Sequence, residues 1–114
     1  MRSFIAALVL CLLNIPVSAE DCVASVYAVG DSSQSGTKTA SGIPLDDSAL
    51  TAAHKSLPFG SKVKVTDKKN GHSATITITD RGPNVEGRCI DVTKAGAGVL
   101  GFSGLAPVSV GIAD

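Results

Sequence analysis

The sequence predicts a mainly β protein: a small closed barrel with two short helices. Short segments alternate apolar and polar residues, most clearly 62–66 and 74–80, which is the pattern of half-buried strands. Strong turn signals such as Asn70-Gly71 separate these segments. Aromatic residues make up only 4% of the chain, so a small barrel fits the sequence better than a helix bundle.

The first half of the fold is expected to contain a strand, a long loop, a helix and a second strand. Residues 23–29 are apolar and β-prone, whereas 30–42 are rich in Gly, Ser and Thr and have no hydrophobic period. Asp47 or Ser48 can cap a short helix over 49–54. A turn at Pro58-Phe59-Gly60 then leads into the alternating strand 62–66.

The second half is expected to contain three further strands, over residues 74–80, 89–92 and 108–112. Asn70-Gly71 joins the first of these to 62–66 as a hairpin. Thr93 can cap a helix over 94–100, where each glycine costs about 1 kcal/mol relative to Ala. Because Gly96 and Gly98 both fall inside it, this helix needs tertiary support.

Asp80 closes the strand 74–80 and opens the turn that follows it. Strict alternation places Asp80 on the same face as Ile76 and Ile78, at the rim of the core. Apolar surroundings raise the pKa of a carboxyl group, which favours a general acid. An Asp that only starts a turn fits the strand and the turn equally well.

The first nineteen residues are expected to be a signal peptide, leaving one domain over residues 20–114. Arg2 supplies the positive charge, residues 4–13 a short apolar stretch, and Val17-Ser18-Ala19 a cleavage site. We expect no lipid or membrane anchor, because the residues before Cys11 and Cys22 are not the small ones of a lipoprotein signal. We expect the mature protein to be exported, either to a bacterial periplasm or to the medium.

The net charge of residues 20–114 argues against a nucleic-acid-binding function. Ten Lys and Arg less Arg2 leave nine against ten Asp and Glu, so residues 20–114 lack the basic excess of a nucleic-acid-binding domain. A near-neutral surface is compatible with a glycan as the binding partner.

Cys22 and Cys89 remain after cleavage and are expected to form a disulfide. A metal site is the weaker alternative because the cysteines and histidines lack ligand spacing, and no cofactor is expected.

The chain contains in order residues 39–42 (TASG), 49–60 (ALTAAHKSLPFG), 62–66 (KVKVT), 70–71 (NG), 79–83 (TDRGP) and 87–91 (GRCID). In order and spacing these motifs resemble the rare lipoprotein A (RlpA) family, across nearly all of residues 20–114. The resemblance implies a six-stranded double-psi β-barrel. It also implies an endolytic peptidoglycan lytic transglycosylase, which cleaves between N-acetylmuramic acid and N-acetylglucosamine and leaves a 1,6-anhydromuramic acid end.

The resemblance assigns roles to two residues and exposes one departure. Asp80 would be the general acid and base, and His54 would help to position it or the substrate. The alternative for His54 is a histidine at a helix C-terminus that interacts with the helix dipole. Family members commonly carry Glu after the TASG run, whereas this chain has Ile43. Asp46 or Asp47 is a possible substitute carboxylate, although an acidic pair at a helix N-terminus is the simpler interpretation.

Four further residues are candidates for substrate binding. Tyr27 and Phe59 can stack on sugar faces, and Arg81 and Arg88 can bind muramyl carboxylates. Each also has a structural interpretation, in the core or in a surface ion pair. We expect a monomer that acts on peptidoglycan strands. Ile43 keeps open a second class, a non-catalytic, expansin-like glycan-binding module.

Overall fold

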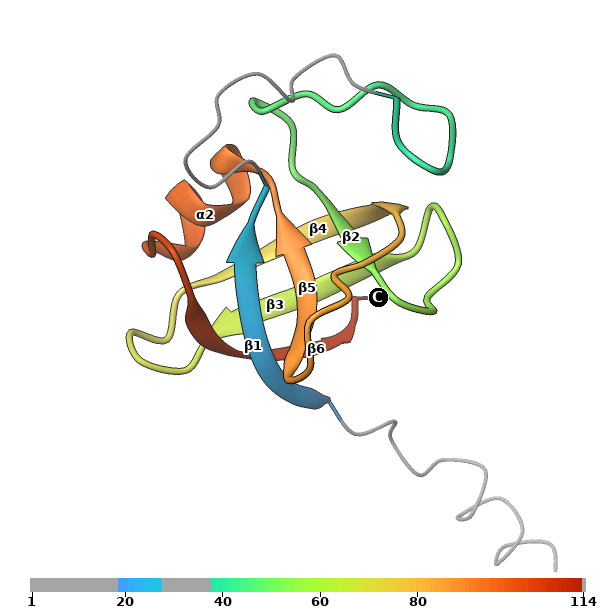
Figure 1. The fold of residues 1–114 in the computed structure, drawn as a ribbon. Helices are drawn as coiled ribbons and strands as arrows, with labels where there is room; N and C mark the ends of the chain where they lie inside the picture. The colour runs from blue at the N-terminus through green and yellow to red at the C-terminus, as the bar shows by residue number, and fades with distance from the viewer. Residues whose placement is uncertain (1–18, 28–37, 114) are drawn as a thin grey trace, which may run out of the picture.

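The computed structural model describes residues 19–27 and 38–113, which form six strands and one α-helix (Figure 1). In chain order these are β1 (Glu20–Val26), β2 (Thr51–His54), β3 (Lys62–Asp67), β4 (Ser73–Asp80), β5 (Arg88–Val92), α2 (Lys94–Leu100) and β6 (Ala106–Ile112). The strands close into a barrel in the order β1-β5-β2-β4-β3-β6. The mainly β class and the small six-stranded barrel are therefore confirmed.

The barrel is mixed, and two of its strand pairs are parallel. β1 runs parallel to β5 and β2 runs parallel to β4, whereas the other pairs are antiparallel. β3 and β4 form the predicted hairpin around Asn70-Gly71, with Val63 opposite Ile76 and Val65 opposite Ala74. β1, β5, β2 and β4 are consecutive neighbours, and these four of the six strands carry the candidate site.

Alternating side chains of the strands fill the barrel. The fully buried ones are largely β-branched, which suits strand backbones. They are Val63, Val65, Ile76, Ile78, Ile90, Val92 and Val108. Leu100 and Ala97 of α2 join the same core, which is the tertiary support that this glycine-containing helix needs.

Thr93 caps α2 as predicted. Its side chain accepts a hydrogen bond from Gly96 N, and Gly101 ends the helix in the left-handed conformation with a φ of 80°. The Thr93 hydroxyl also donates to the carbonyl of Ala49, just before β2. The cap thus connects the helix to the segment that leads into the site.

The second predicted helix, over 49–54, is wrong, because Thr51–His54 form β2. This strand lies between β4 and β5 and bonds to both of them. Ala52 packs in the barrel core beside Ile78 and Val92. A central position in a sheet satisfies backbone groups on both sides, and this outweighs the helix propensity of two alanines. One helix, not two, is present among the described residues.

Two other predictions fall partly outside the described residues. The signal peptide predicted for 1–19 lies there except for Ala19, as does much of the loop predicted for 30–42. β1 begins at Glu20, three residues before the predicted start at Val23. Within the described part, no helix has the length and apolar character needed to cross a membrane.

Candidate functional site

Asp80 lies at the end of β4, and a bulge decides which way it faces. Ala52 pairs with Ile78, but the next residue of β2, Ala53, pairs with Asp80, so Thr79 is an extra residue in β4. A bulge of this kind re-aims a strand side chain. Ala53 packs with Tyr27 and Leu45 in a small cluster separate from the barrel core. Strict alternation therefore misplaced Asp80, which aligns with Ala53 and not with the core residue Ile78.

Three donors from separate segments hold the Asp80 carboxylate. Its Oδ1 accepts from Ala40 N at 2.9 Å and from Arg81 N at 2.9 Å. Its Oδ2 accepts from the hydroxyl of Tyr27 at 2.9 Å. A carboxylate offers about four lone-pair sites, so Oδ2 keeps one for a ligand. This arrangement fixes the carboxylate and still leaves an oxygen that can contact a substrate.

Tyr27 supplies its hydroxyl, not its ring face, to this site. The residue is 8% exposed, so little of the ring is available for stacking on a sugar. Burial raises the pKa of the Tyr27 hydroxyl far above its usual range, and the hydrogen bond to Asp80 and the charges of Asp80 and Asp91 raise it further. Tyr27 therefore stays protonated and acts as a fixed donor.

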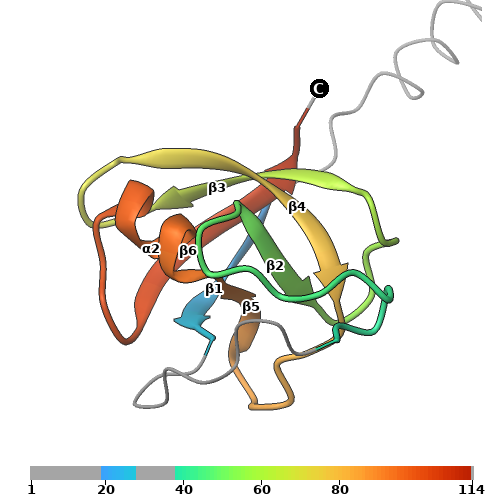
Figure 2. The ribbon, with the colours of Figure 1, turned by 90° about the horizontal axis from the view of Figure 1, so that it is seen from above.

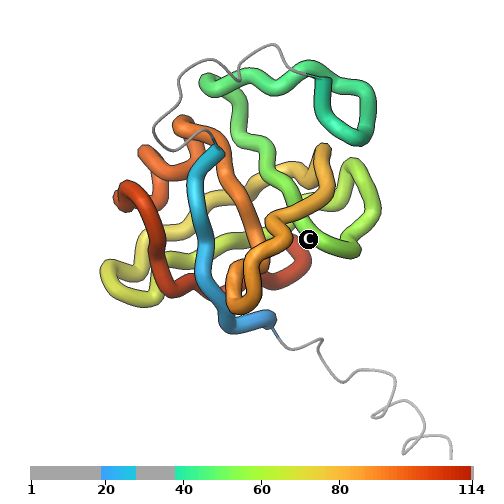
Figure 3. The backbone as a smooth tube through the Cα atoms, viewed as in Figure 1, coloured from blue at the N-terminus to red at the C-terminus, as the bar shows by residue number. Residues whose placement is uncertain are grey.

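The TASG run forms a tight turn that docks against the end of β4. Ser41 N donates to the carbonyl of Thr79, and Thr39 bonds to the carbonyl of Ile43 through its amide and its hydroxyl. Figure 2 shows segment 38–50 passing over β2 with one end near the end of β4, and Figure 3 shows the same segment at the top of the view, across one end of the barrel. The turn presents the Ala40 amide to Asp80. Ile43 in this turn is 56% exposed.

A second carboxylate, Asp91, lies in the same row of side chains as Asp80. Ala53 of β2 pairs with Asp80 on one side and with Asp91 of β5 on the other. Ser25 of β1 continues the row, and its hydroxyl donates to Asp91 Oδ1 at 3.0 Å. Directly paired residues point to one face of a sheet, so both carboxylates share a face. Asp91 was not among the residues predicted for the site, although the motif 87–91 contains it.

Burial raises the pKa of the Asp91 carboxyl group. The Ser25 hydrogen bond and the positive charge of Arg88 act in the opposite direction, and the charge of Asp80 raises the pKa a little more. The net shift is upward. Asp91 also lines a pocket of about 360 Å³ together with Ser25, Arg88, Pro83, Val85 and Leu105.

His54 has both ring nitrogens engaged on the side of the fold away from this row. Nδ1 accepts from the amides of Ser56 and Leu57, so Nε2 carries the proton and donates to Glu20 Oε1 at 3.1 Å. His54 is 6% exposed and lies in a strand, which removes the helix-dipole alternative. Its carbonyl accepts from the Arg81 guanidinium at 3.3 Å. His54 therefore contacts the Asp80 region through its backbone carbonyl, which binds Arg81.

The predicted substrate-binding residues fall at two ends of the row. The guanidinium of Arg81 lies 4.2 Å from the ring centre of Phe59, and Phe59 is 41% exposed. This pair adjoins Asp80. Arg88 lies at the other end, beside Asp91. Aromatic and cationic groups thus flank the two carboxylates.

Asp46 and Asp47 are engaged elsewhere. Asp46 Oδ1 accepts from the amide and the hydroxyl of Ser48, and these bonds lower the pKa of this exposed group. Asp47 Oδ2 lies 3.7 Å from Lys94 Nζ, and the Asp47 carbonyl accepts from the Ala95 amide at the start of α2. The structure does not bring either carboxylate to Asp80.

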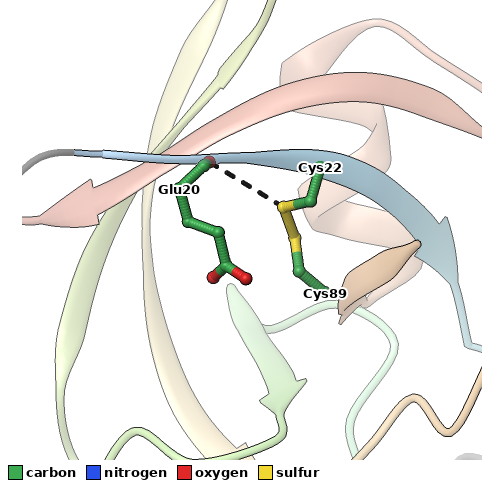
Figure 4. A group of neighbouring side chains, drawn as sticks. All are labelled: Glu20, Cys22 and Cys89. Atoms are coloured by element: carbon green, nitrogen blue, oxygen red, sulfur yellow. Dashed lines mark hydrogen bonds between the residues drawn. A yellow bond between two sulfur atoms is a disulfide. The ribbon is translucent and has the colours of Figure 1, made fainter. Parts of the chain in front are cut away.

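Cys22 and Cys89 form the predicted disulfide, which connects β1 to β5. Figure 4 shows it beside Glu20, and the three side chains have potential metal-binding atoms within 4.8 Å of one another. Only a thiolate is an effective sulfur ligand, and both sulfurs are bonded to each other. In this oxidised form the group offers one carboxylate, which does not make a metal site. A disulfide is typical of proteins outside the cytoplasm.

Comparisons with known proteins agree with these motifs. A family model described as lytic transglycolase matches residues 19–112. The probable endolytic peptidoglycan transglycosylase RlpA of a Nostoc species is 48% identical over 90 residues, which are 77% of this chain and 24% of that protein. The RlpA of Neisseria meningitidis serogroup A is 52% identical over 67 residues, which are 59% of this chain and 28% of that protein.

The relatives are longer than this chain. The RlpA of Rickettsia bellii is 44% identical over 100 residues, which are 85% of this chain and 44% of that protein. The chain thus spans about a quarter to less than half of the length of these relatives. The similarity concerns the barrel that carries the two carboxylates.

Proposed function

Because the chain belongs to the lytic transglycolase family, we propose that it is an endolytic peptidoglycan lytic transglycosylase. It cleaves the bond between N-acetylmuramic acid and N-acetylglucosamine and leaves a 1,6-anhydromuramic acid end. The observation that carries the proposal is the Asp80 carboxylate, which three donors hold on the outer face of the barrel with one lone pair free. The relatives named endolytic peptidoglycan transglycosylase RlpA support the substrate class.

In the simplest scheme Asp80 moves both protons of the reaction. Its protonated form donates to the glycosidic oxygen, so that the bond to the anomeric carbon breaks and the N-acetylglucosamine hydroxyl leaves. The transition state has oxocarbenium character, which a nearby carboxylate stabilises. The muramic acid 6-hydroxyl then bonds to the anomeric carbon and gives its proton to Asp80. No water is consumed, and no cofactor takes part.

The flanking residues bind and orient the glycan. The exposed part of the Phe59 ring offers an apolar surface to a sugar, and Arg81 holds that ring through its guanidinium. Arg81 and Arg88 offer charge to muramyl carboxylates. His54 is a positioning residue, because its ring holds the 56–57 amides and its carbonyl holds Arg81.

The second candidate is a glycan-binding module that does not cleave. Ile43 favours it, because an apolar side chain stands where family members commonly carry Glu and cannot ionise. Residues 20–114 would be exported, to the periplasm or cell surface, and would act there on peptidoglycan strands as a monomer. Both candidates share this location and this ligand.

Product analysis separates the two candidates. Denuded glycan strands are incubated with the protein and with Asp80→Asn, and anhydromuropeptides are measured by mass spectrometry. The transglycosylase yields them at a rate at least about 100-fold above Asp80→Asn, which is the usual contribution of a proton-transfer group. If the wild-type protein binds glycan strands but forms no more anhydromuropeptide than Asp80→Asn does, the protein is a binding module and not a transglycosylase.

Ile43→Glu tests the departure from the family pattern. A rate that rises from background to measurable cleavage identifies Ile43 as the reason for low activity. If the wild-type protein already cleaves, an unchanged rate in Ile43→Glu means that the site has its carboxylates without residue 43. Ile43→Gln is the matched control, because the Gln side chain is polar and has the size of Glu but carries no charge.

A further inference from the structure

Asp91 and Asp80 form a pair of carboxyl groups on one face of the barrel. Each is paired with Ala53, from the two sides of β2. Two strand spacings separate their backbones, which is roughly 9.5 Å. The side chain between them is only the methyl group of Ala53, which packs with Tyr27 and Leu45 and adds no charge to this face. Asp80 and Asp91 are both partly exposed, so a glycan bound across this face reaches both carboxyl groups.

The two carboxyl groups have different surroundings. Asp80 receives two backbone amides and one hydroxyl. Asp91 receives the Ser25 hydroxyl and is half-buried, and burial raises its pKa. The charged and titratable groups that act on Asp91 are Arg88 of β5, Asp80 of β4 and Tyr27, which follows β1. β2 contributes the uncharged Ala53. Two carboxyl groups in such different environments are suited to opposite proton-transfer roles.

Asp91 is also accessible to a ligand of sugar size. The pocket of about 360 Å³ that it lines falls in the usual range for small-molecule sites. Pro83, Val85 and Leu105 give it apolar walls, and Val85 and Leu105 are exposed. Ser25 and Arg88 add polar groups beside the carboxyl. Apolar walls with a few polar groups match the amphipathic surface of a sugar.

We propose that Asp91 is a second catalytic residue, which donates the proton to the leaving glycosidic oxygen while Asp80 accepts the proton of the attacking 6-hydroxyl. The inference rests on the proposed transglycosylase function and deepens it. It gives this chain two carboxyl groups at the site although residue 43 is Ile. Asp46 and Asp47 are not needed for either role.

The step balances without a co-reactant. The Asp91 proton moves to the glycosidic oxygen as the bond from that oxygen to the anomeric carbon breaks, and Asp91 becomes a carboxylate. The muramic acid 6-oxygen forms the new bond to the same carbon, and its proton moves to Asp80. After the products leave, proton exchange with solvent restores the starting forms. Both carboxyl groups approach from one side of the sugar, where the old bond breaks and the new one forms.

The first test measures rate against pH for the wild-type protein, Asp91→Asn and Asp21→Asn on denuded glycan strands. Asp91→Asn keeps glycan retention but lowers anhydromuropeptide formation about 100- to 10,000-fold. Asp21→Asn is the matched control, because Asp21 is an exposed carboxylate on β1 that pairs with Lys68, and its rate stays at the wild-type level. A wild-type rate for Asp91→Asn would overturn the inference.

The second test uses Ser25→Ala and remains decisive if Asp91→Asn does not fold. A proton donor loses activity as the pH rises through its pKa, so Asp91 sets the alkaline limb of the profile. The Ser25 hydrogen bond lowers the pKa of Asp91, and its removal moves that limb to higher pH. If the alkaline limb of the pH–rate profile does not move in Ser25→Ala, Asp91 is not the proton donor and Asp80 alone transfers the protons. Glycan retention without any product from the wild-type protein would instead refute the proposed function itself.

Discussion

At the scale of single residues, Asp80 and Tyr27 are 53 positions apart in the sequence and joined by a 2.9 Å hydrogen bond. The position of Asp80 at the end of a strand was predictable, because the alternating pattern of residues 74–80 stops at the DRGP turn. Its partner was not, since no local pattern records that the residue after β1 reaches the end of β4. The direction of Asp80 also escaped prediction, because the bulge at Thr79 breaks the alternation on which the argument relied.

Tyr27→Phe tests the hydroxyl without disturbing the ring. The variant keeps the packing against Leu45 and Ala53 but removes one of the three donors to Asp80. A hydrogen bond to a charged group contributes about 1.5–3 kcal/mol, so we expect anhydromuropeptide formation to fall by about 10- to 100-fold. At about 4–8 °C per kcal/mol in a domain of this size, the same loss should lower Tm by about 6–24 °C. A full wild-type rate would show that two backbone amides suffice to hold Asp80.

Asp91→Asn is predicted to make stability less dependent on pH while it lowers activity. The folded-state pKa of Asp91 is raised, chiefly by burial, so ionisation favours the unfolded chain. At low pH the carboxyl is protonated in both states and carries no penalty. As the pH rises through the unfolded-state value, the wild-type protein loses stability that Asp91→Asn retains. Denaturant unfolding at several pH values measures this, and a variant less stable at neutral than at acid pH, relative to wild type, contradicts it.

At the scale of secondary-structure elements, β2 shows what local patterns miss. A cap at Asp47 or Ser48 indicated a helix over 49–54, yet residues 51–54 form the strand that aligns Asp80 with Asp91. Its pairing depends on β4 and β5, which are distant in sequence, so propensity alone could not identify it. α2 was predictable because its cap Thr93 and its apolar residues lie within one short segment.

Replacing the two glycines of α2 by Ala is predicted to change the free energy of unfolding in opposite directions. At Gly98 a Cβ meets nothing within 4 Å, so Gly98→Ala should raise the free energy of unfolding by about 0.5–1 kcal/mol through helix propensity. At Gly96 a Cβ meets Val92 Cβ at 3.2 Å and Ile76 Cδ1 at 3.3 Å. Both neighbours are fully buried in the core, so Gly96→Ala should lower it by about 1–3 kcal/mol.

Denaturant unfolding of both variants gives these differences directly, with each glycine serving as the control for the other. Equal stabilisation by the two substitutions would mean that the core beside Gly96 relaxes to accept a methyl group. Equal destabilisation would mean that the helix requires backbone freedom at both positions, which the ordinary helical bounds of α2 do not indicate.

At the scale of the whole molecule, the barrel brings distant motifs to one face. The sequence patterns identify four of the six strands closely, whereas the order β1-β5-β2-β4-β3-β6 arises only from non-local pairing. The TASG turn, the DRGP turn and the motif 87–91 become neighbours because β5, β2 and β4 are consecutive in that order. The disulfide was predictable from two cysteines in an exported domain, although the register that places β1 beside β5 was not.

Removing the disulfide should destabilise the barrel strongly and leave its site intact. Cys22 and Cys89 close a loop with a sequence separation of 67, for which the chain-entropy model gives about 4 kcal/mol. At about 4–8 °C per kcal/mol in a domain of this size, Cys22→Ala/Cys89→Ala should lower Tm by about 15–30 °C. Wild-type protein with a chemical reductant is the control and should melt near the same temperature. Below that Tm the double variant should keep its cleavage rate, because the three donors to Asp80 come from Tyr27, Ala40 and Arg81. A small change in Tm would mean that the β1–β5 ladder holds this edge without the covalent bond.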